Sequence, residues 1–350
     1  MPDETYDYIV VGSGAGGGTV AARLAEAGHS VLVLEAGGDP RALQGGNALH
    51  EGNCLPEDYD VPAFHACATE NRAIAWDYFV RHYASDEQQR RDPKCRLEEG
   101  HIKGVLYPRA GALGGCTAHN AQILICPDNE DWDRIARETE DDSWSSGRMR
   151  KWFEKLERCD HRRGQRLLGE SSPTRHGWSG WLRTEKSVPV EILEDLPLLE
   201  VVADAVAQAS RRTGGILATL DDLVQDHGDP NDWRRIANAD EGLFYTPLTT
   251  CGARRGTRER LLDVAWDHPL AIELDAHATR VLFDGTLAVG VEYRKGRGLY
   301  RAFKAPSGSS GEPRRAFATS ITSRKDRRAG RKTLCRSWRA SSSCAKSWPS

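Results

Sequence analysis

The residues with the clearest chemical meaning form the glycine-rich run 12–17, Gly-Ser-Gly-Ala-Gly-Gly, which fits the pattern GxGxxG. In this pattern the first glycine, Gly12, permits a tight turn, and Gly14 leaves bare backbone against which a pyrophosphate can lie. Gly17 allows close packing of helix on strand, and the unpaired N–H groups at a helix N-terminus favour an anion. We therefore expect Gly12, Gly14, Ala15 and Gly17 to bind a dinucleotide.

An acidic residue follows this run at the distance that a ribose contact requires. Glu35 ends the next apolar stretch, about where an acid roughly 20 positions on accepts hydrogen bonds from a ribose hydroxyl, and we expect Glu35 and the adjacent Ala36 to bind the cofactor. A carboxylate there also disfavours a 2′-phosphate. The alternative, a glycine turn in some other strand–helix unit, is disfavoured because strand, turn, helix and acid occur in register. FAD and NAD share the same ADP half, so this pattern leaves both open.

The elements that must position these residues form a strand–helix–strand unit. Tyr6–Val11 is apolar and β-branched, Thr19–Ala27 is Ala-rich and helical, and Ser30–Glu35 is a second strand. Residues Gly37–Arg96 are rich in Gly, Pro and Asn with weak periodicity, which predicts a long connection over a cofactor rather than packed elements.

Later segments predict helices first and strands afterwards. Helices are expected at Asp131–Ala136, Arg148–Arg158 and Leu196–Ala209, the second with an apolar stripe for the core comprising Met149, Trp152, Phe153 and Leu156. Strands are expected at Ile272–Leu274, Thr279–Phe283 and Leu287–Tyr293, the last two joined by a tight hairpin at Asp284-Gly285. The fold class is therefore α/β followed by α+β.

Charge is distributed unevenly along the 350 residues. Residues 301–350 hold 13 Lys and Arg against 2 Asp and Glu, which leaves a net charge of −14 on residues 1–300. The branched aliphatics of this tail are Ile321 and Leu334 alone, too few to offset the entropy of ordering, so we expect a disordered tail. A nucleic-acid-binding arm is the alternative for such a basic run. A solvated tail with no nucleic-acid partner is favoured.

The cysteines and the N-terminus bear on the cellular compartment. Nine cysteines show no CxxC pair and no clustering with histidines at zinc spacing, so we expect reduced thiols and no metal. The opening Met1-Pro2-Asp3-Glu4 is acidic where a secretory signal would be basic, and no segment reaches the ~18–20 apolar residues of a membrane span. These features predict a soluble cytoplasmic protein.

A second glycine cluster carries a family resemblance. Residues 107–120 read Tyr-Pro-Arg-Ala-Gly-Ala-Leu-Gly-Gly-Cys-Thr-Ala-His-Asn, and Asp131-Trp132-Asp133 follows. Together with the GxGxxG run, Glu35-Ala36-Gly37 and Gly290–Tyr293, this segment resembles the glucose-methanol-choline (GMC) oxidoreductases over roughly residues 5–300. The resemblance implies a Rossmann-like FAD-binding domain of GMC type with part of an α+β substrate domain, and FAD as the cofactor.

The resemblance also implies roles for single residues. The segment along the flavin would contribute Arg109, Gly114, Thr117, His119, Asn120 and Ala121. Ala278 falls where the family presents its backbone to adenine. Asn120 could hydrogen-bond the flavin or the reacting alcohol oxygen. His119 resembles the histidine that choline-oxidase-like relatives bond to the flavin, and a noncovalent neighbour of the flavin ring is the alternative.

The resemblance implies four parts along the chain. Residues 1–160 would form the FAD-binding domain, 161–250 a partial substrate domain, 251–300 a return to the FAD domain, and 301–350 the tail. Beyond about Gly311 the family's Ser-Gly-Ile-Gly signature and late histidine pair, the source of the catalytic base, do not appear, and no histidine follows His277. The catalytic residues are therefore unknown. A truncated or frame-shifted reading and a short relative completed by a partner subunit both fit.

The expected function follows from the family. The chain would belong to an FAD-dependent oxidoreductase that oxidises a small primary alcohol, choline first, to an aldehyde by hydride transfer to flavin, and the chain as it stands would be truncated and inactive. A catalytically dead flavin-binding fragment is one alternative. An NAD-dependent Rossmann dehydrogenase is the weaker alternative, because residues 111–120 have no role in it. The sequence leaves oligomerisation open.

Overall fold

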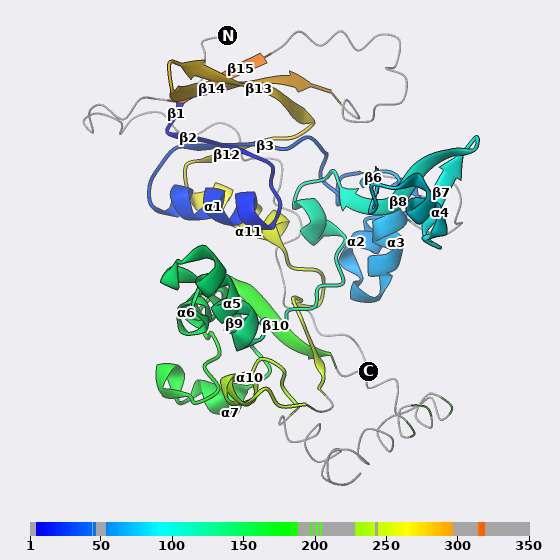
Figure 1. Ribbon diagram of the computed structural model, residues 1–350. Coiled ribbons are helices and arrows are strands. Elements are labelled where there is room, and N and C mark those ends of the chain that lie inside the picture. The colour runs from blue at the N-terminus through cyan, green and yellow to red at the C-terminus, as the bar shows by residue number, and fades with distance from the viewer. Residues whose placement is uncertain are drawn as a thin grey trace.

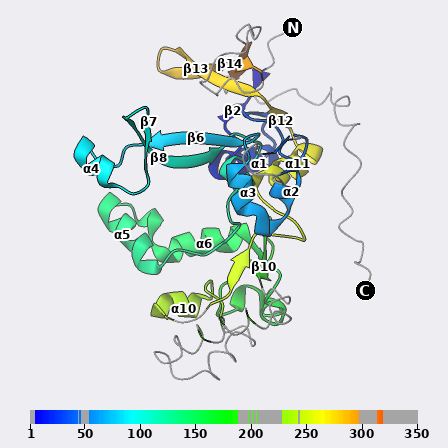
Figure 2. The ribbon, with the colours of Figure 1, turned by 90° about the vertical axis from the view of Figure 1, so that its right-hand side faces the viewer.

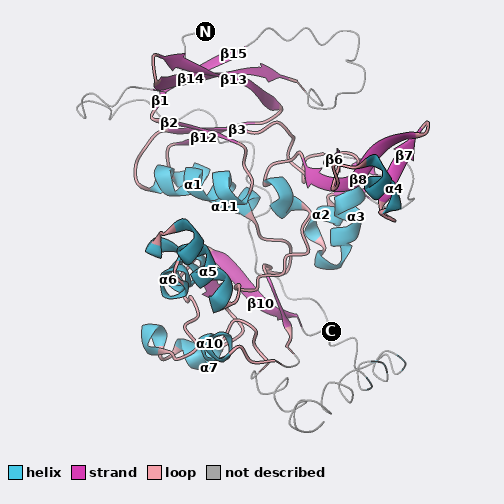
Figure 3. Cartoon of the chain, viewed as in Figure 1, coloured by secondary structure: helices cyan, strands magenta, loops and turns pink. Residues whose placement is uncertain are grey.

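The computed structural model describes residues 5–43, 45–46, 54–187, 197, 201, 204, 228–241, 244–296 and 314–318. Its upper part in Figure 1 has three layers: a sheet containing β13 and β14, a sheet containing β2 and β3, and the helices α1 and α11. A side sheet and a lower helical part complete the molecule (Figure 3). In the described ranges, no helix is long and apolar enough to cross a membrane.

The middle layer confirms the predicted strand–helix–strand unit. Its three strands are β2 (Tyr8–Val11), β3 (Val31–Leu34) and β12 (Leu270–Glu273), all parallel, in the order β12-β3-β2. Helix α1 (Ala15–Glu26) begins directly after the glycine turn, four residues before the predicted start, and α11 (Thr257–Asp267) lies beside it. The chain after residue 250 thus returns to the sheet formed by the first 35 residues.

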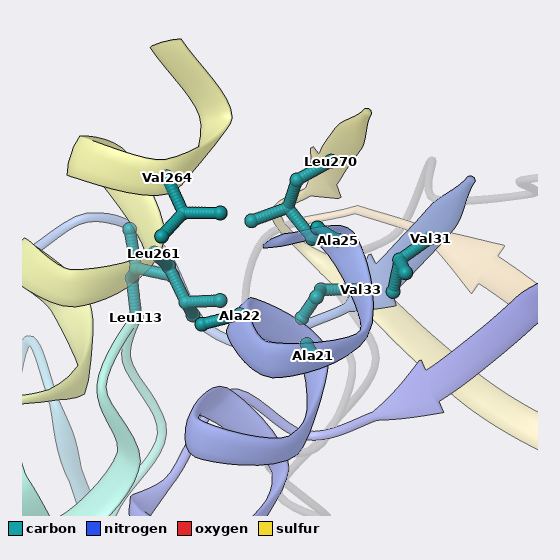
Figure 4. Close-up of a cluster of buried hydrophobic side chains, with 9 residues drawn as sticks. All are labelled: Ala21, Ala22, Ala25, Val31, Val33, Leu113, Leu261, Val264 and Leu270. Carbon is teal, nitrogen blue, oxygen red and sulfur yellow. The ribbon is translucent and has the colours of Figure 1, made fainter. Parts of the chain in front are cut away.

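Strand β3 has both faces buried, which explains its continuous Val-Leu-Val-Leu sequence. Because side chains alternate along a strand, Val31 and Val33 point to one face, where they pack with α1 and α11 residues (Figure 4). Leu32 and Leu34 point to the other face, where they pack against Ala276, Val291 and Tyr293 of the upper sheet. One strand therefore holds the two sheets and the helical layer together.

The upper sheet contains the predicted hairpin and one additional strand. Its strands, in the order β1-β15-β14-β13, are β1 (Thr5–Tyr6), β15 (Arg314–Ala318), β14 (Leu287–Lys295) and β13 (Ala276–Asp284). The turn between β13 and β14 places Gly285 at a φ of +59°, as the Asp-Gly pair predicts. Residues 314–318, within the tail expected to be disordered, pair with β14 and β1 instead. The rest of the tail lies outside the described residues.

The prediction of an irregular connection over Gly37–Arg96 is wrong. This stretch and its continuation form β4 (Gly45–Gly46), β5 (Cys54–Leu55), α2 (Glu57–Asp60), α3 (His65–Glu70), β6 (Ala75–Val80), α4 (Asp86–Arg91), β7 (Cys95–Glu98) and β8 (His101–Ala110). Strand β6 pairs with β8, so its hydrogen-bond partners come from about 30 residues farther along the chain. Figure 2 shows this sheet extending to one side of α1 and α11.

The lower part holds the predicted helices in modified form. Its elements are α5 (Asn129–Thr139), α6 (Ser146–Leu156), β9 (Glu157–Cys159), α7 (Arg163–Arg166), β10 (Leu182–Ser187), α10 (Trp233–Asn238) and β11 (Thr246–Leu248). The predicted core stripe on α6 is wrong for Trp152, which is 61% exposed beside Lys155, whereas Phe153 is buried. The predicted helix Leu196–Ala209 lies outside the described residues, apart from three single positions.

Candidate functional site

The glycine run forms an open turn between β2 and α1. Gly12 has a φ of +90°, a conformation that favours glycine. A Cβ on Gly17 would lie 2.1 Å from the Gly12 carbonyl oxygen, so only glycine permits this approach of helix to strand. At Gly14 a Cβ would meet only the Gly115 Cα, at 3.8 Å. The exposed Ala15 begins α1, whose first turn has no acidic residue, so the turn leaves space and positive potential for a diphosphate.

Glu35 is buried at the end of β3 and hydrogen-bonded to the glycine turn. Its Oε2 accepts from Ser13 N at 2.9 Å and from Ser13 Oγ at 2.5 Å, and its Oε1 accepts from Gly37 N at 2.9 Å. A carboxylate offers about four acceptor positions, so one remains for a ribose hydroxyl. Ala36, the next residue, is half-buried. The ribose contact stays a prediction, whereas the bonds to Ser13 show that Glu35 also fixes the turn.

The loop Gly111–Asn120 lies directly against the glycine turn. Gly114, at a φ of +102°, donates its N–H to Ser13 Oγ at 2.9 Å. A Cβ on Gly115 would lie 2.7 Å from the Gly14 Cα, so glycine is required at position 115 by contact with the turn itself. Two motifs that the sequence separates by about 100 residues thus share one surface. This arrangement fits a ligand that extends from a diphosphate to a flavin.

The start of α11 holds the same loop from the other side. Thr257 Oγ1 lies 2.9 Å from Ser13 O and 3.2 Å from Gly114 O. Thr117, a predicted site residue, donates its hydroxyl to Gly114 O at 2.7 Å and lies 3.1 Å from Thr257 Oγ1. Thr257 and Ser13 were missed by the sequence analysis, since a single hydroxyl carries no recognisable pattern.

His119 is a buried histidine with an unused ring nitrogen. It is 6% exposed, and its Nδ1 has no hydrogen-bond partner among the residues that the structure describes. Burial, together with the charges of Arg254 and Arg109, lowers the pKa of His119 to about 4, so the imidazole is neutral at pH 7. An orphaned nitrogen in this loop fits contact with a flavin ring. Covalent and noncovalent contact are both compatible with it.

The remaining predicted residues occupy different surroundings. Arg109 is exposed at the end of β8, where its guanidinium lies 5.0 Å from the Tyr107 ring. Ala121 is half-buried directly after the loop. Ala278 lies on β13 and packs against the cluster around Leu34, two residues beyond Ala276, whose N–H bonds to Glu35 O. The structure therefore joins the glycine turn, Glu35 and the loop, while the roles of Arg109, Ala121 and Ala278 stay predictions.

Two buried arginines in the segment before and within α11 escaped the sequence analysis. Arg258 forms a two-pronged ion pair with Asp39, at 2.6 and 2.9 Å. Arg254 donates to the backbone of Tyr59 at 2.8 Å and to Asn120 at 2.8 Å. Contacts between residues this distant in sequence give no local signal, yet both arginines bind residues around the proposed site.

A second polar cluster is buried in the lower part of the molecule. Glu157, Cys159 and His176 place possible metal-ligand atoms within 4.8 Å of one another. His176 Nδ1 lies 2.9 Å from Glu157 Oε2, and Glu157 also accepts from Thr184 Oγ1 at 2.9 Å. Burial alone would lower the pKa of His176, but Glu157 and Asp229 raise it well above its usual value. A protonated imidazole between carboxylates accounts for this cluster by hydrogen bonding.

Comparison with known proteins matches this geometry to one family. The sequence matches the GMC oxidoreductases over residues 6–307. It is 30% identical over 295 residues to an oxygen-dependent choline dehydrogenase of Pseudomonas syringae pv. tomato, covering 83% of this chain and 42% of that protein. Pyridoxine 4-oxidase from Mesorbium loti has the same fold (TM-score 0.59, 19% identity, 89% of this chain and 48% of that one). So does formate oxidase (TM-score 0.60, 18% identity, 91% and 45%). The chain thus spans under half the length of these proteins.

Proposed function

Since this chain belongs to the GMC oxidoreductase family, we propose that it binds FAD along the glycine turn and the Gly111–Asn120 loop and serves the oxidation of a small primary alcohol. FAD is the cofactor, as the sequence predicts. The observation that carries the proposal is the hydrogen bond from Gly114 N to Ser13 Oγ, which joins the dinucleotide turn to the loop. Choline is the first substrate to test, because the relatives named above include a choline dehydrogenase.

Each part of the site has a separate task in this proposal. Bound FAD supplies the acceptor for a hydride from the alcohol carbon. The glycine turn binds its diphosphate, Glu35 its ribose, and the loop lies along the ring system. Hydride transfer becomes easier as the alcohol oxygen gains negative charge, so a base and a hydrogen-bond donor near that oxygen determine the rate.

A narrower function, FAD binding without turnover, is favoured by one feature. With a pKa of about 4, His119 is a weak base for an alcohol proton at neutral pH. A general base is most effective when its pKa lies near the working pH and contributes ~10²–10⁴-fold in rate. We therefore expect this chain alone to bind FAD and to turn over alcohols slowly or not at all. The NAD-dependent alternative gives the Gly111–Asn120 loop no role.

Two measurements test these statements in order. Titration of the full chain with FAD and with NAD should show tighter binding of FAD, and tighter binding of NAD would refute the proposal. Anaerobic mixing of FAD-loaded protein with choline and a panel of primary alcohols then follows bleaching of the flavin absorbance. Rapid bleaching would show that a sufficient base exists, with His119, His227 and His277 the first to substitute.

A further inference from the structure

Arg254 is a buried cation that binds the end of the Gly111–Asn120 loop. It is 2% exposed, in the turn that precedes α11. Its Nε donates to Tyr59 O at 2.8 Å, and its Nη1 donates to Asn120 O at 2.8 Å and to Thr117 O at 3.2 Å. The guanidinium fork thereby ties the loop to α2.

The same guanidinium fixes the orientation of the Asn120 amide. Arg254 Nη1 lies 2.9 Å from Asn120 Oδ1, and the backbone N–H of Gln122 lies 3.2 Å from the same oxygen. A guanidinium and a backbone N–H can only donate, so the amide atom that faces both must be the oxygen. The amide nitrogen therefore points away from Arg254. Asn120 is exposed, and in the described part of the chain its Nδ2 donates to no partner.

Among the residues that the structure describes, no carboxylate is bonded to Arg254, and Glu259 and Asp60 act on its charge only from a greater distance. Its contacts are neutral oxygens of the backbone and of Asn120, and its Nη2 is buried without a hydrogen-bond partner among the described residues. A buried charge without an ion-pair partner is costly, so its retention calls for a reason beyond packing. A cation that binds an amide oxygen polarises the amide and strengthens its N–H groups as donors.

We infer that Arg254 is a positioning residue that holds Asn120 Oδ1 inward and presents the Asn120 amide nitrogen as a hydrogen-bond donor to the flavin ring. The inference rests on the proposed FAD site and adds to it a specific partner atom. It makes Asn120 a hydrogen-bond donor through its amide nitrogen, and it assigns that donor to the flavin and not to the alcohol oxygen. Isoalloxazine carries acceptor oxygens and nitrogens along its edge, which a polarised amide would bind.

The test is a double-mutant cycle on FAD affinity, measured with the full chain freed of flavin and titrated with FAD. Asn120→Asp keeps an oxygen facing Arg254 but replaces the donating amide nitrogen with an acceptor oxygen and adds a negative charge, whereas Arg254→Lys keeps the cation and removes the fork. Each change should weaken FAD binding about 10-fold, the loss of one hydrogen bond. The double variant should bind no more weakly than either single one, because the two residues act as a unit. Arg255→Lys is the control, since Arg255 pairs with Asp263 instead, and it should stay within about twofold.

The outcomes separate this inference from the proposed function. If the losses of FAD affinity in the two single variants multiply in the double variant, or if Asn120→Asp leaves the FAD affinity unchanged, the positioning role of Arg254 is refuted. The proposed FAD site would stand in either case. A wild-type chain that fails to bind FAD would overturn the proposed site and the inference with it. Should Arg254→Lys fail to fold, the ¹⁵N side-chain amide signal of Asn120 in the wild-type chain decides. It should shift and its protons should exchange more slowly when FAD is added, and an unchanged signal refutes the inference.

Discussion

The buried ion pair between Arg258 and Asp39 provides a sharp test of how the site is held together. Nε and Nη2 of Arg258 lie 2.6 and 2.9 Å from the two carboxylate oxygens of Asp39, and the side chains are 6% and 5% exposed. Burial alone would lower the pKa of Arg258, but the bonds to Asp39 raise it above its usual value. The pair joins the segment after β3 to α11. Asp39→Asn should therefore leave a buried cation whose remaining ion-pair partner among the described residues is Glu259.

The expected magnitude follows from burial. Removing one partner of a buried pair costs about 3–5 kcal/mol of unfolding free energy. Arg258 also lies 3.0 Å from Glu259 Oε1, which partly compensates the remaining charge, so we expect a loss near 3 kcal/mol. The exposed pair Arg255–Asp263, at 3.2 Å with side chains 34% and 62% exposed, should contribute about 0–1 kcal/mol.

Urea unfolding followed by tryptophan fluorescence measures these differences. Asp39→Asn and Arg258→Met should each lower the midpoint strongly, and the double variant should lose less than the sum of the two, because it leaves no unpaired charge. Arg255→Met is the matched control. A loss below about 1 kcal/mol for Asp39→Asn, similar to the control, would refute the argument that this pair fixes the site.

Three further predictions concern the titrating and cofactor-binding groups. Glu35→Gln should weaken FAD binding about 10-fold, because a neutral amide cannot accept from Ser13 and Gly37 as the carboxylate does, and an FAD titration that shows no change would contradict this role. His119 should titrate near pH 4 in ¹H NMR, and His119→Ala should leave all flavin colour in the supernatant after acid precipitation, whereas colour that stays with the variant would exclude His119 as an attachment point. Burial alone would lower the pKa of His161, but Asp229 and Cys159 raise it to about 10, so between pH 6.5 and 10 His161 holds a proton in the folded state that it has released in the unfolded chain. The contribution of His161 to stability should therefore fall as pH rises through that range, and His161→Gln should reduce the pH dependence measured by urea unfolding at pH 7 and pH 9.

The features that the sequence predicted correctly are local ones. The glycine run and Glu35 lie within 24 residues of each other, and the hairpin depends on the dipeptide Asp284-Gly285. Each conformation is determined by the residues that carry the pattern, such as the positive φ at Gly12 and at Gly285. The family resemblance implied in addition that the glycine turn and the Gly111–Asn120 loop contact the same cofactor, which residue spacing alone does not predict.

The features that the sequence missed depend on partners far along the chain. Strand β6 reads Ala-Trp-Asp-Tyr-Phe-Val without clean alternation, and it exists because β8 supplies its hydrogen bonds. Strand β15 lies in a polar, basic tail and is ordered by pairing with β14 and β1. Trp152 fits a helical stripe, but no element in the described part of the chain covers it. Pattern reasoning assigns faces to an element and cannot say what covers them.

Ser13 connects the glycine turn, Glu35 and the Gly111–Asn120 loop, so we expect these three parts to respond to substitution as one unit. Its hydroxyl donates to Glu35 Oε2 and accepts from Gly114 N, while its carbonyl oxygen accepts from Thr257. Hydrogen bonds in such a chain polarise one another, so the loss of one member weakens the others. Glu35 therefore acts on the Gly111–Asn120 loop through Ser13. Loss of the Glu35 carboxylate should then disturb the flavin end of the site as well as the ribose end, which a residue that only binds ribose would leave unchanged.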